Sequence, residues 1–539
     1  MTVATLPAAP VAADPAALDL DDACSVAVLL EEAMQRYGAR IAFRCRGEAL
    51  TFADVDRLSR DLAAFLQAGL GLRKGERVAV MLPNVPAFPV ALAAIVRAGA
   101  VQVNVNPQYT PRELAHQLVD SGAETMIVFD SALATLAEVV ERTPVRRVIV
   151  VPRGGDAPAV EMRIGGAIGF HTALEKGSHL PFTPVPASGE DLLFLQYTGG
   201  TTGVSKGAAL SHRNLVANVR QFKAFLPNAF RPGAEVVVTA LPLYHIFALM
   251  VNLLCAFTEG AENWLVPEAR DLDALTDTFG ASRCTFFTGV NTLYASLARH
   301  PRFAELDFSA LRLCIGGGAA VLPATSGRWK EITGVDILEG YGLSETSPVL
   351  TLNPDTRGGF SGTAGLPFAA THIKLVDEDG VECPSGEPGE ICAKGPQVMR
   401  GYWNQPEATA AAFTQDGYFR TGDVGVFDAR GMLKIVDRRK DMVIVSGFNV
   451  YPNEIEAVAA SCPGLAECAC IGVPDAKTGE AVRLYGVRAP GSSITEADVL
   501  AHCRAQLTGY KMPRQVRFME ALPKSSVGKI LRRELRGLD

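Results

Sequence analysis

Segments with the apolar spacing of helices alternate with short β-rich segments along much of the chain, and no other sequence feature limits the fold as strongly. Residues 51–69 have the pattern of an amphipathic helix that begins with Thr and Asp, and residues 77–81 have the pattern of a strand. A further helix is expected at 88–98, and strands are expected at 124–129 and 147–151. This alternation is typical of α/β proteins, so we predict an α/β fold.

Four other segments indicate how the chain is divided into domains. Residues 152–188 are rich in Gly and Pro and are predicted to be a surface connection, whereas the βα pattern resumes at 311–342. Residues 370–437 have short strand patterns, many turns and few helices, which indicates a β-barrel-like subdomain. The run DRRKD at 437–441 is charged at every position and is expected to be a solvated, mobile turn.

The residues after this charged run have the mixed pattern of a small α+β domain. Residues 453–456 are expected to cap a helix. Further helices are expected at 495–507 and 530–535, with strands at 442–445, 469–473, 481–488 and 515–519. We therefore divide the chain into a loose N-terminal arm (1–24), a large domain (25–437), a hinge (438–440) and a small mobile lid domain (441–539).

Composition excludes several classes of protein. Of the 539 residues, 48% are hydrophobic and 20% are charged, which excludes a mainly disordered chain. The formal net charge of −7 gives no support for a nucleic-acid partner. Residues 236–257 lack Asp, Glu, Lys and Arg, but they begin with the strand-like VVVT and contain Pro242, His245 and Asn252. A folded segment is therefore expected there in preference to a membrane span.

The cysteines and the N-terminus indicate the compartment. The 11 cysteines are scattered without a paired framework, which favours reduced thiols over disulfides or a zinc site. Residues 1–20 contain no Lys or Arg and so lack the basic start of a secretory signal. We expect a cytoplasmic protein, with peripheral contact at the inner membrane face as a further option, that acts as a monomer or a homodimer.

The strongest local signal is a glycine-rich loop, YTGGTTGVSKG at residues 197–207, between strand patterns at 192–198 and 208–210. Its glycines allow backbone N–H groups to converge, and its hydroxyl groups and Lys206 add donors and a positive charge, which suits a polyphosphate. It is not a Walker A loop, because Lys206 is followed by Gly207 rather than by Ser or Thr. The alternative is an ordinary flexible hairpin.

This loop resembles the signature of the adenylate-forming superfamily, which includes acyl-CoA synthetases, luciferases and peptide-synthetase adenylation domains. The resemblance covers nearly the whole chain from about residue 25. Matching stretches follow in the expected order at 242–247, 316–319, 340–346, 389–396, 418–423, 437–438, 445–454 and 523–529. NVNPQYTPRELAHQL, PLYHIFAL, GVNTL, SGFNVYPNEIE, LTGYK and GKILRREL are similar to bacterial long-chain fatty-acid–CoA ligases.

The resemblance implies a two-step activation of a carboxylic acid. ATP and the acid form an acyl-adenylate with release of pyrophosphate, and the thiol of coenzyme A then displaces AMP. The first step brings a carboxylate against an anionic phosphate, so positive charge and Mg²⁺ are expected near phosphorus. The implied substrates are ATP, coenzyme A and a medium- to long-chain fatty acid, and no nucleic acid is involved.

The matching motifs assign residues to the nucleotide. Asp423 would accept hydrogen bonds from the ribose hydroxyls, with Arg438 beside it, and Tyr341 would stack on adenine, although a buried core Tyr is the alternative. Thr201 and Thr202 would bind the β- and γ-phosphates. The implied ATP and AMP residues are Thr198, Gly199, Gly200, Thr201, Thr202, Gly203, Ser205, Lys206, Gly317, Gly318, Ala319, Gly340, Tyr341, Gly342, Thr346, Asp423, Arg438 and Lys529.

The same motifs assign four residues to the chemistry. Lys529 would bridge the carboxylate and the α-phosphate, and Glu345 would hold Mg²⁺, with Thr201 at the phosphates. His245 would lie beside the acyl carboxylate at the entrance of the acyl tunnel, although composition by itself favours a core histidine. Without the resemblance, Glu345 would be read as a surface residue of a Gly-rich turn, and Lys529 as a solvated lysine.

The remaining assignments concern the acid, coenzyme A and the hinge. Phe247, Leu249 and Val251 alternate as in a strand, and the resemblance implies that this region lines the acyl pocket. No charged residue lies between 236 and 257, which disfavours a charged or amino-acid substrate. The implied acyl-pocket residues are His245, Phe247, Leu249, Val290, Gly316 and Gly342. The strip Ser446, Gly447 and Phe448 would approach pantetheine, and Lys440 matches the pivot of a rotating lid.

Three alternatives remain beside this assignment. An aryl-CoA ligase for cinnamate-like acids would have the same motifs. A fatty-acyl-AMP ligase that loads a carrier protein is disfavoured, because no insertion is seen between Thr346 and Gly389. A non-catalytic nucleotide sensor is disfavoured because both Glu345 and Lys529 are retained.

Overall fold

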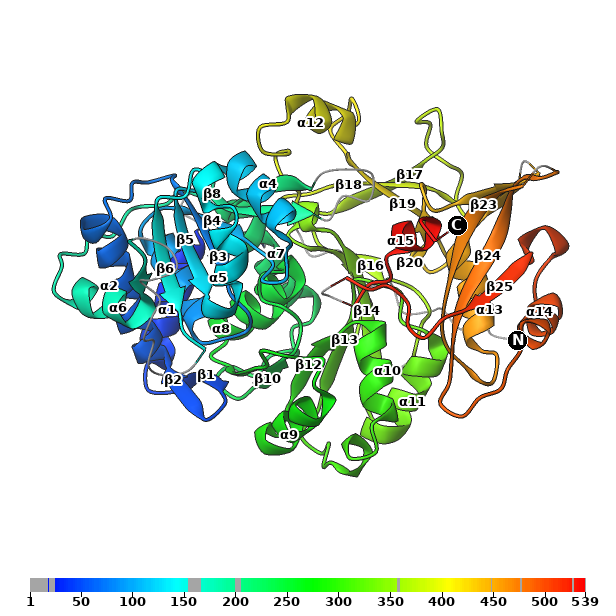
Figure 1. The fold of residues 1–539 in the computed structure, drawn as a ribbon, viewed down its shortest axis with the longest axis horizontal. Coiled ribbons are helices and arrows are strands. Elements are labelled where there is room, and N and C mark those ends of the chain that lie inside the picture. Colours follow the sequence, from blue (N-terminus) through cyan, green and yellow to red (C-terminus); the bar gives the residue numbers. More distant parts are fainter. Residues whose placement is uncertain are drawn as a thin grey trace, which may run out of the picture.

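The computed structural model describes residues 18, 25–153, 166–198, 205–355, 359–446, 448–475, 477–525 and 528–538. Figure 1 shows two large sheets with their helices side by side, and the C-terminal domain at the opposite end from the first elements of the chain. Leu18, in the expected loose arm, is buried, and its carbonyl oxygen accepts a hydrogen bond of 2.8 Å from Arg220. At this residue the arm is packed against the large domain rather than loose.

The first large sheet has seven strands in the order β7-β6-β5-β3-β4-β8-β9, and all neighbours are parallel except β8 and β9. Its central strands are buried along almost their whole length, as expected when helices cover both faces of a parallel sheet. The strands are β3 (Arg77–Met81), β4 (Val101–Asn104), β5 (Thr125–Phe129), β6 (Arg147–Val151), β7 (Ile168–Gly169), β8 (Leu192–Thr198) and β9 (Lys206–Ser211).

The second sheet has nine strands in the order β16-β15-β14-β13-β12-β10-β11-β1-β2. Its middle strands, from β14 to β1, are parallel, and antiparallel strands close both edges. The strands are β1 (Ile41–Cys45), β2 (Glu48–Thr51), β10 (Val236–Thr239), β11 (Glu262–Leu265), β12 (Phe286–Gly289), β13 (Leu313–Gly316), β14 (Ile337–Gly342), β15 (Val349–Leu352) and β16 (Leu366–Pro367).

Several helices of the large domain, among them α1, α2, α4, α7 and α9, begin at the polar residues that the sequence favours for caps. Thr51 and Asp54 form a reciprocal capping box at α2, and Thr110 and Glu113 form another at α4. The helices are α1 (Val26–Tyr37), α2 (Phe52–Ala64), α3 (Ala87–Arg97), α4 (Pro111–Ser121), α5 (Leu133–Ala137), α6 (Phe170–Ser178), α7 (His212–Phe225), α8 (Ala256–Thr258), α9 (Leu272–Ser282), α10 (Asn291–Arg299), α11 (Pro323–Thr333) and α12 (Pro406–Ala412).

Two expectations for this domain are wrong. The predicted surface connection at 152–188 contains β7 and the helix α6, whose Phe170 and Ala173 are buried in the main core. Residues 247–251 do not alternate as a strand, because Ala248–Cys255 form a π-helical turn that is buried on every side. A segment that is apolar at successive positions has no face to present to water, so its pattern does not distinguish a strand from a buried helix. Among the described residues, no helix is both long enough and apolar enough to cross a membrane.

The expected barrel-like segment forms an antiparallel sheet in the order β17-β18-β19-β20. No pairing between β17 and β20 closes this sheet among the described residues, so it is an open sheet. Its strands are β17 (His372–Val376), β18 (Gly389–Lys394), β19 (Phe419–Phe427) and β20 (Leu433–Arg438).

The C-terminal domain, which we call the lid, has its own sheet, β22-β21-β24-β23, with β25 paired to β24. Its core is a separate cluster of buried side chains that includes Val443, Ile455 and Leu484. The elements are β21 (Val443–Val445), β22 (Phe448–Val450), α13 (Pro452–Ala460), β23 (Leu465–Asp475), β24 (Gly479–Arg488), α14 (Glu496–Arg504), β25 (Gln515–Phe518) and α15 (Arg532–Arg536).

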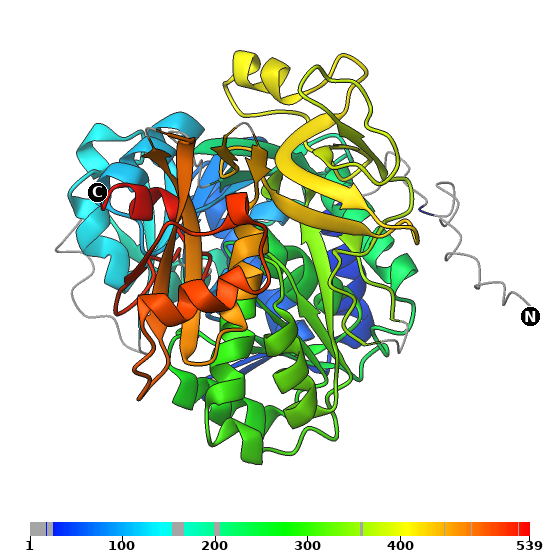
Figure 2. The ribbon, with the colours of Figure 1, turned by 90° about the vertical axis from the view of Figure 1, so that its right-hand side faces the viewer.

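One predicted helix start in the lid is confirmed and another is wrong. Thr495 caps α14 in a capping box with Asp498, as the sequence predicts. Residues 453–456 do not cap α13, which begins at Pro452 after Tyr451 and receives no cap from its own N-cap side chain. Seen from the lid side, in Figure 2, the lid lies over the large domain.

Candidate functional site

The candidate site lies where β13 and β14 end, at Gly316 and Gly342. In open α/β sheets, ligands bind outside the carboxyl ends of parallel strands, where the following loops leave the sheet. In Figure 1 the segment between β25 and α15 extends from the lid toward these strand ends. The site is therefore formed by both domains.

Lys529 reaches this position from the lid. A Cβ atom added to Gly318 would lie 3.1 Å from Cε and 3.8 Å from Nζ of Lys529, so the lysine stem lies directly against this glycine. Gly318 also has a φ of +77°, in the left-handed region. A side chain at position 318 would therefore be strained and would collide with Lys529.

The loop that carries Lys529 is fixed by hydrogen bonds. Ser525 donates its N–H to the carbonyl oxygen of Lys529 at 2.7 Å, and Lys529 donates its own N–H to Ser525 Oγ at 3.1 Å. Thr292, at the start of α10 in the large domain, donates its hydroxyl to the carbonyl oxygen of Gly528 at 3.3 Å. The last bond ties the loop to the large domain next to the lysine.

The ammonium group of Lys529 is surrounded by charges. Burial and, to a smaller extent, the charge of Arg438 lower its pKa to about 8, while Asp423 and Glu345 act in the opposite direction. The lysine therefore lies within electrostatic range of both acidic residues that the sequence assigns to the nucleotide and the metal. It is mostly charged at neutral pH, but burial disfavours that charge.

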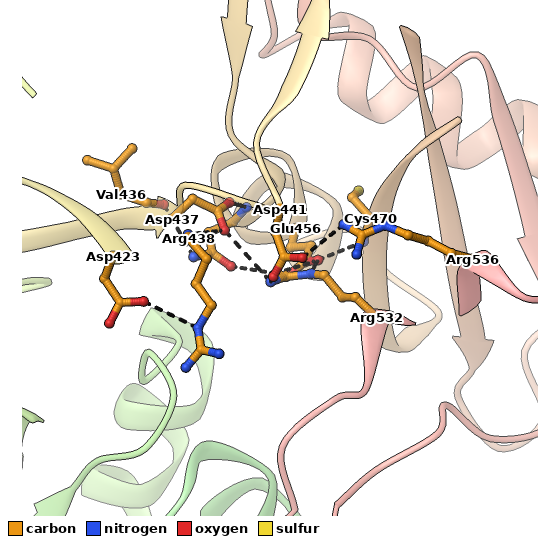
Figure 3. A network of polar contacts seen from close by, with 10 residues as sticks. Asp423, Val436, Asp437, Arg438, Asp441, Glu456, Cys470, Arg532 and Arg536 are labelled. Carbon is orange, nitrogen blue, oxygen red and sulfur yellow. Dashed lines mark hydrogen bonds and ion pairs between the residues drawn. The ribbon is translucent and has the colours of Figure 1, made fainter. Parts of the chain in front are cut away.

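Asp423 lies on β19 and is buried, with two partners. Tyr341 on β14 donates its hydroxyl to Asp423 Oδ2 at 2.7 Å, and Arg438 on β20 lies 3.3 Å from Asp423 Oδ1 through its Nε (Figure 3). Asp423 and Arg438 are Cα partners in the antiparallel ladder, which explains how the strands bring them together. The tyrosine is thus oriented through its hydroxyl, while its ring packs against the small core of Leu375, Ile391 and Leu433.

Glu345 is buried in the short turn after β14, and burial raises its pKa. Tyr402 donates its hydroxyl to Glu345 Oε1 at 2.9 Å, and the Nζ of Lys206 lies 5.1 Å from the centroid of the same tyrosine ring. Thr346 holds the turn, since its Oγ1 accepts the N–H of Leu343 at 3.0 Å. Tyr402 therefore connects the expected metal residue with the end of the glycine-rich loop, a role that its sequence position did not indicate.

His245 lies within electrostatic range of Lys529. Burial lowers its pKa to about 3, and the charge of Lys529 contributes to the shift. The N–H of Phe247 approaches His245 Nδ1 at 3.4 Å. The imidazole is therefore neutral at physiological pH, which is compatible with a role in shaping a site for a carboxylate and not with a role as a cationic anchor.

Residues 199–204 lie outside the described residues, and so the predicted positions Gly199, Gly200, Thr201, Thr202 and Gly203 have no structural account here. The two ends of the loop are described. Thr198 and Lys206 are Cα partners at the end of the β8–β9 ladder.

The helix α4 holds both ends of this loop. His116 Nε2 lies 2.8 Å from the carbonyl oxygen of Ser205, to which it donates when that nitrogen is protonated. The hydroxyl of Tyr197 donates to Asp120 Oδ2 at 2.5 Å. The sequence analysis missed His116 and Asp120, because they are far from the loop along the chain and belong to no phosphate-binding pattern.

Several predicted glycines are required by packing within the large domain. A Cβ on Gly316 would lie 2.5 Å from Val321 Cγ2, and one on Gly342 would lie 1.8 Å from the carbonyl oxygen of Pro348. A Cβ on Gly340 would meet Leu352 Cδ1 at 3.0 Å. These contacts within the protein are sufficient to require glycine at the three positions, so no ligand is needed to explain them.

The predicted acyl residues lie around Gly317 and Gly318. A Cβ on Gly317 would lie 3.1 Å from the ring of Phe247, and one on Gly318 would lie 3.6 Å from Val290 Cγ1. Leu249 is fully buried in the π-helical turn. Ala319 follows this glycine pair and is exposed.

The predicted coenzyme A strip lies elsewhere on the lid. Ser446 has a φ of +53° and donates its N–H to the carbonyl oxygen of Thr478 at 2.8 Å. Phe448 is 56% exposed and stacks on Tyr510, with ring centroids 4.8 Å apart. Gly447 lies outside the described residues. Since most of Phe448 is exposed, the large domain does not cover the strip in this orientation of the lid.

The sequence suggested that the charged run at 437–441 is a solvated turn, but both of its end residues are buried. Asp437 and Asp441 are buried, and Arg532 of the lid lies 3.7 Å and 3.5 Å from their carboxylates (Figure 3). Lys440, the predicted pivot, and Arg439 are exposed. The run therefore has a buried residue at each end and exposed residues between them.

Comparison with known proteins gives consistent results. The sequence matches the family described as AMP-binding enzyme over residues 30–403 and the one described as AMP-binding enzyme C-terminal domain over residues 454–529. A long-chain-fatty-acid–CoA ligase of Escherichia coli O6:H1 is 47% identical over 539 residues, which cover 97% of this chain and 96% of that protein.

Solved structures show the same fold. The anthranilate CoA ligase AuaEII in complex with anthranoyl-AMP has a TM-score of 0.89 at 28% identity, covering 96% of this chain and 98% of that one. ATP-bound MatB from Rhodopseudomonas palustris has a TM-score of 0.84 at 32% identity, covering 95% and 98% of the two chains. The apo form of MatB has a TM-score of 0.74 at the same identity and coverage.

Proposed function

Because the chain belongs to the AMP-binding enzyme family, we propose that it is an ATP-dependent, AMP-forming fatty acid–CoA ligase, specific for medium- to long-chain acids. The carboxylate oxygen of the acid attacks the α-phosphorus of ATP, and pyrophosphate leaves with the electrons of the broken P–O bond. The sulfur of coenzyme A then attacks the acyl carbon of the adenylate. AMP leaves, and the thiol proton is released.

The observation that carries this proposal is the position of Lys529. It is brought from the lid against Gly318 and lies within the electrostatic reach of Glu345 and Asp423. A buried ammonium group with no anionic ligand is unfavourable, and a phosphate and a carboxylate are the ligands that would offset the cost. In adenylation, Lys529 would stabilise the negative charge that develops between the acid and phosphorus.

The surrounding residues support the same reaction. Asp423, held by Tyr341 and Arg438, would accept hydrogen bonds from ribose, and Lys206 and the glycine-rich loop would bind the phosphates. His245 is neutral and so would not compete with Lys529 for the acyl carboxylate. The absence of side chains at Gly317 and Gly318 lets the backbone lie close to Phe247 and Lys529, which a Cβ at either position would crowd.

The residues present fit Mg²⁺. Glu345 offers a hard carboxylate oxygen in a buried position, and because burial raises its pKa, a bound cation would favour its charged form. Mg²⁺ is usually bound by one or two carboxylates together with substrate phosphates. Accordingly, no group of three or more acidic, His or Cys side chains arranged for a metal is found in the described part of the chain. When bound, the ion would neutralise phosphate charge, and Glu345 would hold it.

The orientation of the lid fits the first step. Lys529 is docked, whereas Ser446 and Phe448 are left exposed, so coenzyme A would have to meet these residues in another orientation. The greater similarity to ATP-bound than to apo MatB supports this assignment. We propose that the lid, residues 441–539, rotates about Lys440, within the hinge 438–440, relative to the large domain of 25–437.

The relatives support a fatty acid over an aromatic acid. The E. coli ligase named for long-chain fatty acids is 47% identical, whereas AuaEII, named for anthranilate, is 28% identical. The apolar π-helical turn beside Phe247 also fits a hydrocarbon chain. Each buried methylene contributes about 0.8 kcal/mol, so the depth of the pocket should control chain-length preference.

The location and assembly are predictions from the sequence. The described cysteines are free, which fits a reducing cytoplasm. A homodimer or monomer, and peripheral contact with the inner membrane face, remain expectations.

The test is AMP release that depends on coenzyme A, measured across saturated acids of increasing length and across benzoate, anthranilate and cinnamate. We expect the highest kcat/KM with long saturated acids. Preference for an aromatic acid would replace the substrate assignment by an aryl-CoA ligase. If no acid supports ATP–pyrophosphate exchange, the proposal that the protein is an adenylate-forming enzyme is refuted.

A further inference from the structure

We propose that Asp437 is a positioning residue that favours the adenylate-forming orientation of the lid, because its carboxylate caps helix α13 and faces Arg532 from across the hinge. This inference rests on the proposed function, in which the lid alternates between two orientations about Lys440. Asp437 belongs to the large domain, since it pairs with Val424 in the β19–β20 ladder. Asn453 and Arg532 belong to the lid.

The capping contact is specific. Asn453 donates its backbone N–H to Asp437 Oδ2 at 2.8 Å, and its side-chain amide donates to the carbonyl oxygen of Val436 at 3.2 Å. The first N–H groups of a helix have no partner within the helix, and α13 receives no cap from its own N-cap residue, Tyr451. A carboxylate at this end also interacts favourably with the helix dipole. Asp437 therefore supplies, from another domain, the cap that α13 lacks.

An ion pair between Asp437 and Arg532 adds to this capping contact. Arg532 Nη1 lies 3.7 Å from Asp437 Oδ1, and Asp437 is only 1% exposed (Figure 3). A carboxylate buried to this degree is favourable only where hydrogen bonds and positive charge compensate for lost water. Two of its compensating groups, the Asn453 N–H and Arg532, come from the lid, and the third is the N–H of the neighbouring Arg438, which donates to Asp437 Oδ1 at 2.7 Å.

Arg532 does not depend on Asp437 in the same way. Within the lid, its Nη2 lies 2.8 Å from Glu456 Oε2 and donates to Asn453 Oδ1 at 2.6 Å, and its Nη1 lies 3.5 Å from Asp441 Oδ2. Arg536 also pairs with Asp441, at 2.8 Å. These partners follow Lys440 in the chain and would move with Arg532 when the lid rotates.

Because of this difference, separating the two domains costs more at Asp437 than at Arg532. Rotation about Lys440 would leave Arg532 with its lid partners but would take Asn453 and Arg532 away from Asp437, which would keep only the N–H of Arg438. The cost of separation therefore falls on Asp437 and on the uncapped start of α13. Since α15 begins at Arg532, three residues after Lys529, the same network places the loop of the catalytic lysine relative to the hinge.

The test compares the two half-reactions in the full-length protein. Adenylation is measured by ATP–pyrophosphate exchange with a long saturated acid, and thioester formation is measured from supplied acyl-adenylate and coenzyme A. If each rate follows the population of its own lid orientation, the ratio of the adenylation rate to the thioester-forming rate reports the equilibrium between the two orientations, whichever one predominates. For Asp437→Ala we expect this ratio to fall roughly fivefold to thirtyfold, as expected for loss of a cap. Asp437→Asn keeps a hydrogen-bond acceptor and should have a smaller effect.

Glu456→Gln is the matched control, because it weakens a buried partner of Arg532 that lies within the lid. It should change the ratio much less than Asp437→Ala does, even if it lowers stability, because this contact lies within the lid and is kept in both orientations.

A second measurement does not depend on turnover. Dyes attached at the exposed positions Val119, in the large domain, and Leu538, in the lid, would report lid orientation by fluorescence energy transfer. Asp437→Ala should shift the transfer efficiency, and Glu456→Gln should not. An unchanged ratio and unchanged transfer in a folded Asp437→Ala protein would overturn the proposal. If the parent protein makes no acyl-adenylate, the proposed function fails, and the transfer measurement still decides whether Asp437 holds the lid.

Discussion

Replacement of Lys529 by Ala should separate the two half-reactions. The ammonium group lies against Gly318 and close to Glu345 and Asp423, where it can act on the reacting carboxylate and phosphorus. Coenzyme A is expected to react with the lid in another orientation, in which the lysine would be withdrawn. Lys529→Ala should therefore suppress adenylation and leave thioester formation from supplied acyl-adenylate largely intact.

The magnitude follows from two opposing effects. Loss of one preorganised donor in a site shielded from water costs about 3–4 kcal/mol in the transition state, or roughly 10²- to 10³-fold in rate. Against this, the fall of the lysine pKa from 10.5 to about 8 corresponds to a cost of about 3 kcal/mol for docking the charged side chain without ligands. The Ala variant avoids that cost, so its lid should dock at least as well. The loss should therefore appear in kcat for adenylation and not in lid closure.

The assay is single-turnover formation of acyl-adenylate, followed by a separate measurement of thioester formation from added acyl-adenylate. Lys524→Ala is the control, because Lys524 lies in the same segment but pairs with Glu467 of the lid at 2.7 Å. It should retain adenylation within about threefold, as expected for a partly exposed ion pair. Equal loss of both half-reactions in Lys529→Ala, or an equal effect of Lys524→Ala, would show that the lysine acts through lid structure rather than on the reacting atoms.

The remaining predictions concern the metal, pH and the hinge. Glu345→Gln should raise the Mg²⁺ concentration needed for half-maximal adenylation by roughly tenfold, since it removes the charged ligand; an unchanged Mg²⁺ titration would exclude Glu345 as that ligand. Because the pKa of Lys529 is lowered to about 8, its ammonium group is charged below that pH and neutral above it, so kcat/KM for adenylation should fall as the pH rises through about 8. In Lys529→Arg any residual activity should lose this alkaline decline, because a guanidinium stays charged, and a decline that persists would point to another group. Lys440→Pro fixes φ near −65° and should hold the lid in one orientation, with adenylation retained and thioester formation reduced at least about tenfold; circular dichroism would confirm folding, and equal effects on both steps would remove Lys440 as the pivot.

Much of the secondary structure could be predicted from local patterns. The predicted strands at 77–81, 147–151 and 192–198 coincide with β3, β6 and β8. Buried parallel strands are apolar at successive positions, so their ends are visible as changes in composition. The starts of α2 and α14 were equally visible, because Thr51 and Thr495 form capping boxes with residues three positions later.

The candidate site was predictable only as a set of motifs. Gly318, Glu345, Asp423 and Lys529 were assigned by resemblance to a family, and the structure brings them together around the ends of β13 and β14. His116, Asp120 and Tyr402 were missed. Each acts on the site through a contact with a residue far away in the chain, and no spacing rule relates such pairs.

The sequence by itself determined the elements whose stability comes from neighbours along the chain, namely the apolar strands, the capped helices and the glycine-rich turns. Only the tertiary structure decided how charged and uniformly apolar segments are used. Residues 248–255 form a helical turn that is buried on all sides. No exposed face therefore reveals their helical periodicity in the sequence. Asp437 is buried, contrary to its place in a charged run, because Arg532 and the N-terminus of α13 compensate its charge. The burial of a charge depends on partners supplied by the fold, and these partners cannot be read from the residues beside it.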